Sequence, residues 1–182
     1  MNNIITQEKG LVMVFTAMVL PVILMIGALI IDGGSLYTRH SEIEHLSRQS
    51  GQSGLLELSK ILELQATQNY AVQCSVETPP AKCSSSNLFE FLTATEIQNI
   101  VLNGTNQNTV TTNVETFSLN YDPQSNLTEE NITTTYPYLY EINDTEVKIL
   151  VEINTLPDLL MGKFLTNDRA ISYQSVSYLP LQ

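Results

Sequence analysis

An uninterrupted apolar segment near the N-terminus constrains this chain more than any other feature. Residues 11–31 contain no charged side chain, and Thr16 is the only polar one among them. At about 1.5 Å per residue this segment forms a helix roughly 32 Å long, which matches a hydrocarbon core of about 30 Å. In lipid, a helix satisfies its backbone hydrogen bonds within a single segment. The sequence therefore predicts one transmembrane helix over residues 11–31, behind a polar leader of residues 1–10.

A cleaved signal peptide is the competing interpretation of this segment. The apolar core of a signal peptide has about 7–15 residues and ends at a cleavage site between small residues. Here the apolar run is longer, and it leads directly into Asp32-Gly33-Gly34. Its length favours an uncleaved anchor.

The charge of the chain is concentrated after the anchor. The net charge is −11, and of the 19 acidic residues only Glu8 and Asp32 precede residue 33. Such a surface repels phosphate, so we expect no nucleic-acid partner. Membrane lipid is the expected partner of residues 11–31. Because only Lys9 precedes the span and Arg39 and Arg48 follow it, the positive-inside rule does not decide the orientation.

The two cysteines bear on the compartment of the domain. Cys74 and Cys83 are the only cysteines, and Pro79-Pro80 lies between them. Such a pair readily closes a short loop in an oxidising compartment. A disulfide would place the domain outside the cytoplasm, and two unrelated buried thiols are the alternative.

Helical periodicity continues after the span. Over residues 32–68 we expect an amphipathic helix with two apolar stripes, and a hinge or break near residues 47–54, where glycine and serine weaken the helix. The two stripes consist of Leu36, Ile43 and Leu46, and of Leu55, Leu58, Ile61, Leu62 and Gln65.

Residues 69–182 are expected to form an extracytoplasmic domain that begins with a loop (69–88) and a short helix (88–102). Strand-like composition follows, and the clearest strand is 146–154, where apolar and charged residues alternate. The other expected strands are 109–121, 133–142 and 171–179. The predicted fold class is α+β, with a small antiparallel sheet packed on the amphipathic helix.

The residues suggest no enzyme. His40 and His45 are five positions apart, so they do not share a helical face as a metal-binding pair would. The sequence contains no glycine-rich phosphate loop and no catalytic triad that its spacing supports. We therefore expect no catalytic residue, metal, cofactor or small-molecule substrate.

Both ends of the chain carry a recognisable pattern. The N-terminal end has a Gly before the apolar run, a Leu-Pro pair within it, and an Asp and a Tyr after it. The C-terminal end has an alternating strand, Leu156-Pro157 with a leucine-rich connection, and a last strand. The N-terminal pattern residues are Gly10, Leu20, Pro21, Asp32 and Tyr37. This pattern resembles the TadE/TadG-like proteins of Tad (Flp) pilus assembly, and the chain is similar to a short TadG-like or TadF-like minor pilin.

The resemblance implies a pilin-like fold and a role as a minor pilin or assembly factor. It also implies a single-pass protein of the bacterial inner membrane, with a cytoplasmic N-terminus and a periplasmic or extracellular C-terminal domain. The resemblance allows the protein either to stay in the membrane or to be incorporated into a pilus. The implied partners are other pilin-like proteins and the pilus assembly machinery, contacted through a membrane helix in which Phe15, Pro21 and Gly27 are the expected packing positions. A prepilin peptidase would cut between Gly10 and Leu11.

Phe15 departs from the pilin pattern, because pilins and TadE-type proteins carry a Glu five residues after the leader Gly. TadG-type proteins often have an apolar residue there. An assembly factor or a filament cap fits this position better than a repeating subunit. The alternative function is a membrane-tethered adhesin or binding domain, whose Thr- and Asn-rich segments would contact a ligand.

Overall fold

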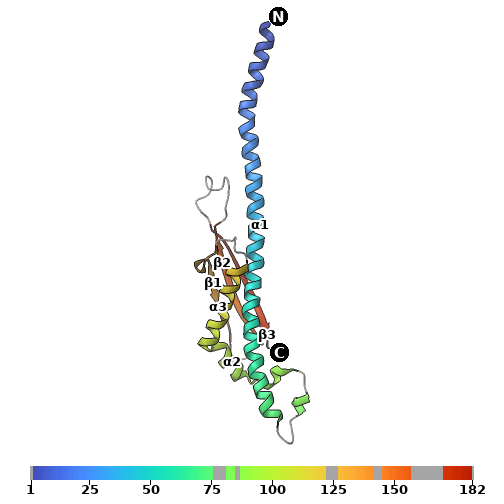
Figure 1. The fold of residues 1–182 in the computed structure, drawn as a ribbon, viewed down its shortest axis with the longest axis vertical. Helices are drawn as coiled ribbons and strands as arrows, with labels where there is room; N and C mark the ends of the chain where they lie inside the picture. The colour runs from blue at the N-terminus through green and yellow to red at the C-terminus, as the bar shows by residue number, and fades with distance from the viewer. Residues whose placement is uncertain are drawn as a thin grey trace. The chain divides into compact units, whose positions relative to one another are not determined.

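The computed structural model describes residues 2–75, 81–84, 87–121, 127–141, 145–156 and 170–181. One long helix, α1, begins the chain and is followed by two shorter helices and three strands (Figure 1). Their bounds are α1 Asn2–Cys74, α2 Ala94–Leu102, α3 Gly104–Tyr121, β1 Ile132–Thr135, β2 Glu146–Thr155 and β3 Ile171–Pro180. Three 3-10 turns complete the order: η1 Ala81–Ser84, η2 Leu88–Phe91 and η3 Glu129–Asn131. The chain divides into two compact units, residues 1–41 with 156–171 and residues 42–155 with 172–182.

The three strands form one antiparallel sheet in the order β1-β2-β3. Strand β1 pairs antiparallel with β2, with Ile132 opposite Ile153. The Leu181 N–H donates to the Thr145 carbonyl at 2.8 Å, and Gln174 near the start of β3 reaches Glu152 near the end of β2 at 2.9 Å. Strand β3 therefore also runs antiparallel to β2. Long helices and this small sheet confirm the α+β class.

The core of the second unit lies between the sheet and the helices. Strand β2 buries every second residue, as its alternating sequence predicted. The fully buried members are Val147, Ile149, Val151 and Ile153. Helix α1 contributes a stripe at helical spacing, of which Leu55, Leu58, Leu62 and Ala66 are buried. The strand over 146–154 and this second apolar stripe are thus confirmed, and so is the last strand over 171–179.

Four small residues of α1 form a contact surface that we call the serine–glycine seam: Ser47, Ser50, Gly51 and Gly54, all of them buried. Ser47 Oγ donates to the Val151 carbonyl of β2 at 2.9 Å and lies 2.6 Å from Ser175 Oγ of β3. Ser118 Oγ of α3 donates to Ser50 Oγ at 2.7 Å. The seam therefore joins α1 to β2, β3 and α3 at once.

The two glycines of the seam allow this close approach. A Cβ at Gly51 would lie 2.6 Å from Ser177 Oγ, and a Cβ at Gly54 would lie 2.6 Å from Val114 Cγ2. No larger residue fits either position without displacing a neighbour. At the seam, the backbone of α1 therefore lies directly against the sheet and α3, as small residues permit in closely packed helices.

Helix α1 runs through residues 47–54 without interruption, contrary to the break we expected there. Low helix propensity argued for the break, but propensity is a weak determinant that tertiary packing overrides. Here the sheet and α3 cover the small residues and hydrogen bond to their side chains. The small side chains of these glycines and serines leave room for the sheet and α3 to approach the helix. The packing against them stabilises the helix despite its low intrinsic propensity.

The predicted strand over 109–121 is wrong, because these residues lie in α3. Their Thr and Val content is typical of strands. The residues that α3 buries are Val110, Val114 and Ser118, which recur every four positions and so form one helical face. Asn103 begins the helix, because its Oδ1 accepts from the N–H groups of Thr105 and Asn106 at 2.9 and 3.3 Å.

Three further element boundaries differ from expectation. Residues 69–74 belong to α1 rather than to a loop, and the helix expected over 88–102 is divided into η2 and α2. The division is marked by a capping box, in which Thr93 and Glu96 exchange hydrogen bonds at the start of α2. The strand expected over 133–142 ends at Thr135, two residues before Pro137, which has no N–H to donate to a ladder. Residue 142 and the connection 157–169 lie outside the described residues.

Substitution at the seam should measure how much the close approach contributes. We expect Gly54→Ala to lower the stability of the protein, because overpacking costs roughly 1–3 kcal/mol and outweighs the gain of about 1 kcal/mol in helix propensity. Gly34→Ala is the matched control, since a Cβ there meets no atom within 4 Å. Thermal unfolding followed by circular dichroism checks both variants. If Gly54→Ala unfolds at or above the wild-type temperature, the seam is not tightly packed.

The capping box should make stability depend on pH. The backbone N–H and hydroxyl of Thr93, together with the Asn69 amide, lower the pKa of Glu96 below its ordinary value of 4.5. A lowered folded-state pKa adds stability that is present above the unfolded pKa and is lost as the pH falls through the folded one. We expect Glu96→Gln to be less stable at pH 7 by about 0.5 kcal/mol, because solvent screens this exposed carboxylate and Gln keeps part of the capping box, and the difference should close as the pH falls below 4.5.

Urea unfolding of wild type and Glu96→Gln between pH 3 and pH 7 checks this dependence. Glu90→Gln, which removes an exposed carboxylate outside the capping box, is the control. A constant difference between wild type and Glu96→Gln across this range would contradict the argument.

Candidate functional site

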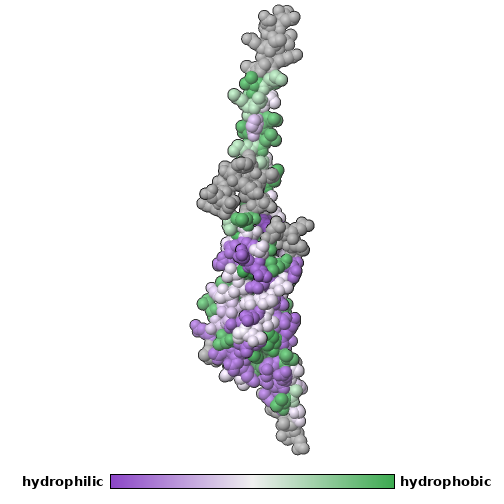
Figure 2. Space-filling view, turned by 60° about the vertical axis from the view of Figure 1, so that its left-hand side comes forward, coloured by the Kyte–Doolittle hydropathy of each residue, from purple (hydrophilic) through white to green (hydrophobic). Residues whose placement is uncertain are grey.

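The first candidate surface is the apolar part of α1 in the first unit. Its side chains over residues 12–31 are mostly exposed, including Phe15 at 68% and Ile30 at 70%. Figure 2 shows this surface as hydrophobic residues along the upper part of the helix. Exposed apolar area on this scale is unfavourable in water. By length and composition, α1 can cross a membrane.

The residues that carry the family resemblance occupy this part of α1. Gly10 and Leu11 are helical, and their surroundings lie outside the described side chains. Phe15, Leu20, Pro21 and Tyr37 are exposed. None of these exposed residues forms a site with the others, and their role as packing positions stays a prediction.

Asp32 and Gly27, also in the first unit, are less exposed than these residues. Asp32 is buried at 6% exposure, just beyond the apolar span. A Cβ placed at Gly27 would meet no atom of the chain within 4 Å, so Gly27 makes no tight contact within the described chain. Gly27 stays a predicted position for contact with a partner helix, because a flat glycine surface admits close helix packing in lipid.

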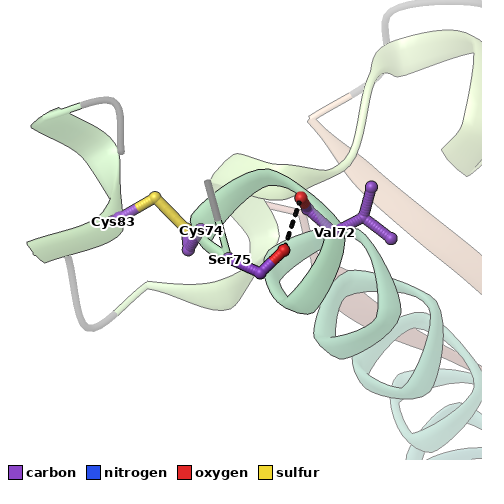
Figure 3. The surroundings of a disulfide bond; sticks show 4 residues. All are labelled: Val72, Cys74, Ser75 and Cys83. Atoms are coloured by element: carbon purple, nitrogen blue, oxygen red, sulfur yellow. Dashed lines mark hydrogen bonds between the residues drawn. A yellow bond between two sulfur atoms is a disulfide. The ribbon is translucent and has the colours of Figure 1, made fainter. Parts of the chain in front are cut away.

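The predicted disulfide is present. Cys74, the last residue of α1, is bonded to Cys83 in η1, and the two Cα atoms are 5.8 Å apart. Figure 3 shows the bond beside the end of the helix, where the Ser75 hydroxyl donates to the Val72 carbonyl at 3.3 Å. The hydroxyl satisfies one of the carbonyls that a helix end leaves without a partner. The disulfide closes a loop of nine positions at this end.

The C-terminal end of α1 is also held by the segment that follows the loop. Tyr70 packs edge-on against the buried ring of Phe91, with ring centroids 5.1 Å apart. Asn69 Nδ2 donates to the Phe91 carbonyl at 2.9 Å and to Glu96 Oε1 at 3.0 Å. These contacts tie the last turns of α1 to η2 and α2. The disulfide is therefore one of several restraints on this end of the helix.

The second candidate surface is a shallow groove between α1 and α3 in the second unit, which we call the α1–α3 groove. It consists of two hollows of about 540 and 330 Å³ that share Asn113 and Thr116. Helix α1 contributes Ser53 and Glu57, and α3 contributes the other side. The α3 residues are Thr105, Asn108, Thr109, Thr112, Asn113, Thr116, Phe117, Asn120 and Tyr121.

Sequence reasoning missed this groove, because the strand predicted over 109–121 would have divided these residues between two faces of a sheet. The signal that could have found it is the helical spacing of Thr105, Thr109, Thr112 and Thr116. That spacing places four hydroxyls on one side of a helix. The same residues that suggested a strand therefore mark the groove.

Titratable groups do not assemble into a centre within the part of the chain that the structure describes. Across these ranges, no group of three or more His, Cys, Asp or Glu residues could hold a metal ion. His40 and His45 are both exposed. The buried phenol of Tyr136 has a pKa that burial raises above its ordinary value, and its hydroxyl has no hydrogen-bond partner among the residues that the structure describes. A single neutral phenol does not make a reactive site.

Comparison of the chain with known protein families, with curated proteins and with solved structures finds no match. The functional argument therefore depends on the surfaces of the chain itself. These are the apolar span, the disulfide-bonded end of α1 and the α1–α3 groove.

Removing the disulfide should destabilise the domain. Closing a loop of this length contributes roughly 2–3 kcal/mol through the unfolded state, so Cys74→Ser with Cys83→Ser should unfold at lower denaturant than wild type. Mass spectrometry of the native protein, alkylated before and after reduction, checks that both thiols react only after reduction. Ser75→Ala is the control, because it alters the same helix end and keeps the bond. Free alkylation of the unreduced protein would contradict the disulfide.

Proposed function

We propose that this chain is a minor pilin-like component or assembly factor of a Tad (Flp) type pilus, anchored in the bacterial inner membrane. One observation carries the proposal. Helix α1 runs unbroken from Asn2 to Cys74, with a span of lipid length near its start and the packing surface for the sheet near its end. A pilin subunit needs both properties in one helix, because it rests in lipid before assembly and packs against other subunits afterwards.

The exposed side chains of residues 12–31 support this dual use. In a membrane, lipid covers them, and in a filament the equivalent helices of neighbouring subunits cover them. The same apolar surface serves both environments because neither offers hydrogen bonds. Gly27 and Pro21 are the proposed points of helix contact, and other pilin-like proteins are the proposed partners.

Phe15 indicates which role within the pilus is the better fit. In the pilin pattern a Glu at this position is thought to neutralise the N-terminal amine of a neighbouring subunit, since an unpaired buried charge is costly. Phe15 has no carboxylate and is 68% exposed. We therefore assign the chain to the start or tip of a filament, or to the membrane as an assembly factor.

The disulfide supports the orientation of the proposal. Structural disulfides persist in oxidising compartments such as the bacterial periplasm. The bond between Cys74 and Cys83 thus favours a domain outside the cytoplasm and a cytoplasmic N-terminus. Cleavage between Gly10 and Leu11 by a prepilin peptidase belongs to the same proposal.

A membrane-tethered adhesin or binding domain is the second candidate function. The α1–α3 groove is the observation that favours it, because an open groove lined mostly by uncharged polar side chains suits a ligand. The two functions are compatible in a subunit at a pilus tip. They differ in what is lost when the protein is absent.

Deletion of the coding sequence distinguishes these functions. We expect the deletion strain to lack pili by electron microscopy, and the wild-type copy to restore them. In purified filaments, the protein should be far less abundant than the major subunit. A deletion strain that makes normal numbers of pili but fails to attach would favour the adhesin, and stoichiometry equal to the major subunit would contradict the role of cap or assembly factor.

A further inference from the structure

The outer face of α3 uses residues that weaken a helix. Its exposed positions include Thr105, Asn108, Thr109, Thr112 and Thr116. Thr and Asn have lower helix propensity than Glu, Lys, Gln or Ala, which usually occupy a solvated helix face. Local choices that contradict the secondary structure tend to occur at functional surfaces. By this criterion the outer face of α3 is a candidate binding surface.

Several of their polar groups have no partner in the part of the chain that the structure describes. No hydrogen bond there involves the hydroxyls of Thr112 and Thr116 or the amide of Asn108. By contrast, Asn113 Oδ1 accepts from Ser53 Oγ at 2.6 Å, which leaves the Asn113 NH₂ group as a donor. Asn120 Nδ2 donates to the Thr116 carbonyl at 2.8 Å, which leaves the Asn120 Oδ1 atom as an acceptor. The groove thus presents donors and acceptors side by side, two of them held in orientation.

One end of the groove adds an aromatic surface. Phe117 and Tyr121 lie with their ring centroids 6.0 Å apart, and Tyr121 is 46% exposed. An exposed aromatic ring offers an apolar face with a polar tip. The only charged residue in the groove is Glu57, and Lys60 pairs with it at 2.9 Å. The groove is therefore close to neutral in a chain of net charge −11.

We propose that the α1–α3 groove binds a neutral oligosaccharide chain. Sugar hydroxyls both donate and accept, as do the hydroxyls and amides that line the groove. The C–H face of a sugar ring can stack on the exposed ring of Tyr121. From Thr105 to Tyr121 the helix extends roughly 24 Å, so the groove suits an extended chain rather than a single sugar.

Other classes of ligand fit the groove less well. Nucleic acid and other phosphate ligands require Lys or Arg, and neither lines the groove. The centres of protein interfaces are enriched in aromatic residues, Met and Arg, and their hot spots are poor in Ser and Thr. The groove has two aromatic residues, Phe117 and Tyr121, both at one end, and neither Met nor Arg. Seven of the nine α3 residues in the groove are Thr or Asn with exposed or half-exposed side chains. A hydrated, uncharged ligand is the best match to this lining.

The proposal is tested on the full chain in lipid nanodiscs. The probes are chitohexaose, cellohexaose and maltohexaose, with saturation-transfer NMR to detect binding and calorimetry to measure the dissociation constant. We expect at least one probe to bind, and Thr112→Glu, Thr116→Glu and Tyr121→Ala each to weaken that binding about tenfold or more. Glu is a better helix former than Thr, so the two Glu variants should retain the fold, which circular dichroism verifies.

Thr95→Glu is the matched control, because Thr95 is an exposed threonine of α2 that lies outside the groove. Binding should be unchanged in this variant. Failure of all three probes to bind, or equal binding by wild type and the groove variants, would overturn the proposal. Capture of a pilin-like protein by a cross-linker placed at Thr112, without sugar binding, would overturn it in favour of a protein interface. None of these results depends on whether the deletion strain makes pili, so the inference fails or holds separately from the proposed function.

Discussion

The contact between α1 and the sheet at the serine–glycine seam is the interaction on which the rest of the second unit depends. At this contact, α1 approaches β2, β3 and α3 closely enough for Ser47 to reach a strand carbonyl and for Ser118 to reach Ser50. The hydroxyls that this approach buries have hydrogen-bond partners, so they do not carry the cost of an unsatisfied polar group. On either side of the seam, leucines and isoleucines complete an apolar core. Close packing of α1 against the sheet and α3 stabilises the domain, because each surface excludes water from the other.

Helix α1 has two different surroundings along its length. Over residues 12–31, its side chains are exposed and apolar, and lipid or a neighbouring helix must cover them. Beyond residue 42 one apolar face of the helix is covered by the chain itself, and the exposed side carries polar residues together with Leu56, Leu64 and Val72. The disulfide, Tyr70 and Asn69 then hold its final turns. This division is what the pilin-like proposal requires, and the uncharged groove beside α3 adds a surface that anchoring alone does not explain.

Much of the fold could be predicted from the chain, and the failures have physical causes. The strand over 146–154 was recognisable because apolar and charged residues alternate along it, and the stripe from Leu55 to Leu62 because its apolar residues repeat at helical spacing. Residues 109–121 were mistaken for a strand, since Thr and Val favour strands where no partner decides otherwise. In the folded protein, α3 buries Val110, Val114 and Ser118 on one face. A spacing of four positions suits one face of a helix and one face of a strand alike, so it did not distinguish the two structures. The groove was missed for the same reason.

Sequence alone determined the lipid-length apolar span, the central strand and the cysteine pair, because each depends on residues that are neighbours in the chain or on a strict local period. Only the tertiary structure decided that α1 continues through its glycines and serines, that α3 is a helix, and that Thr and Asn side chains line a groove beside Ser53. These outcomes depend on contacts between residues more than 60 positions apart, such as Ser50 with Ser118 and Ser47 with Ser175. Local propensity is worth less than about 1 kcal/mol per residue, and burial against a distant partner exceeds it.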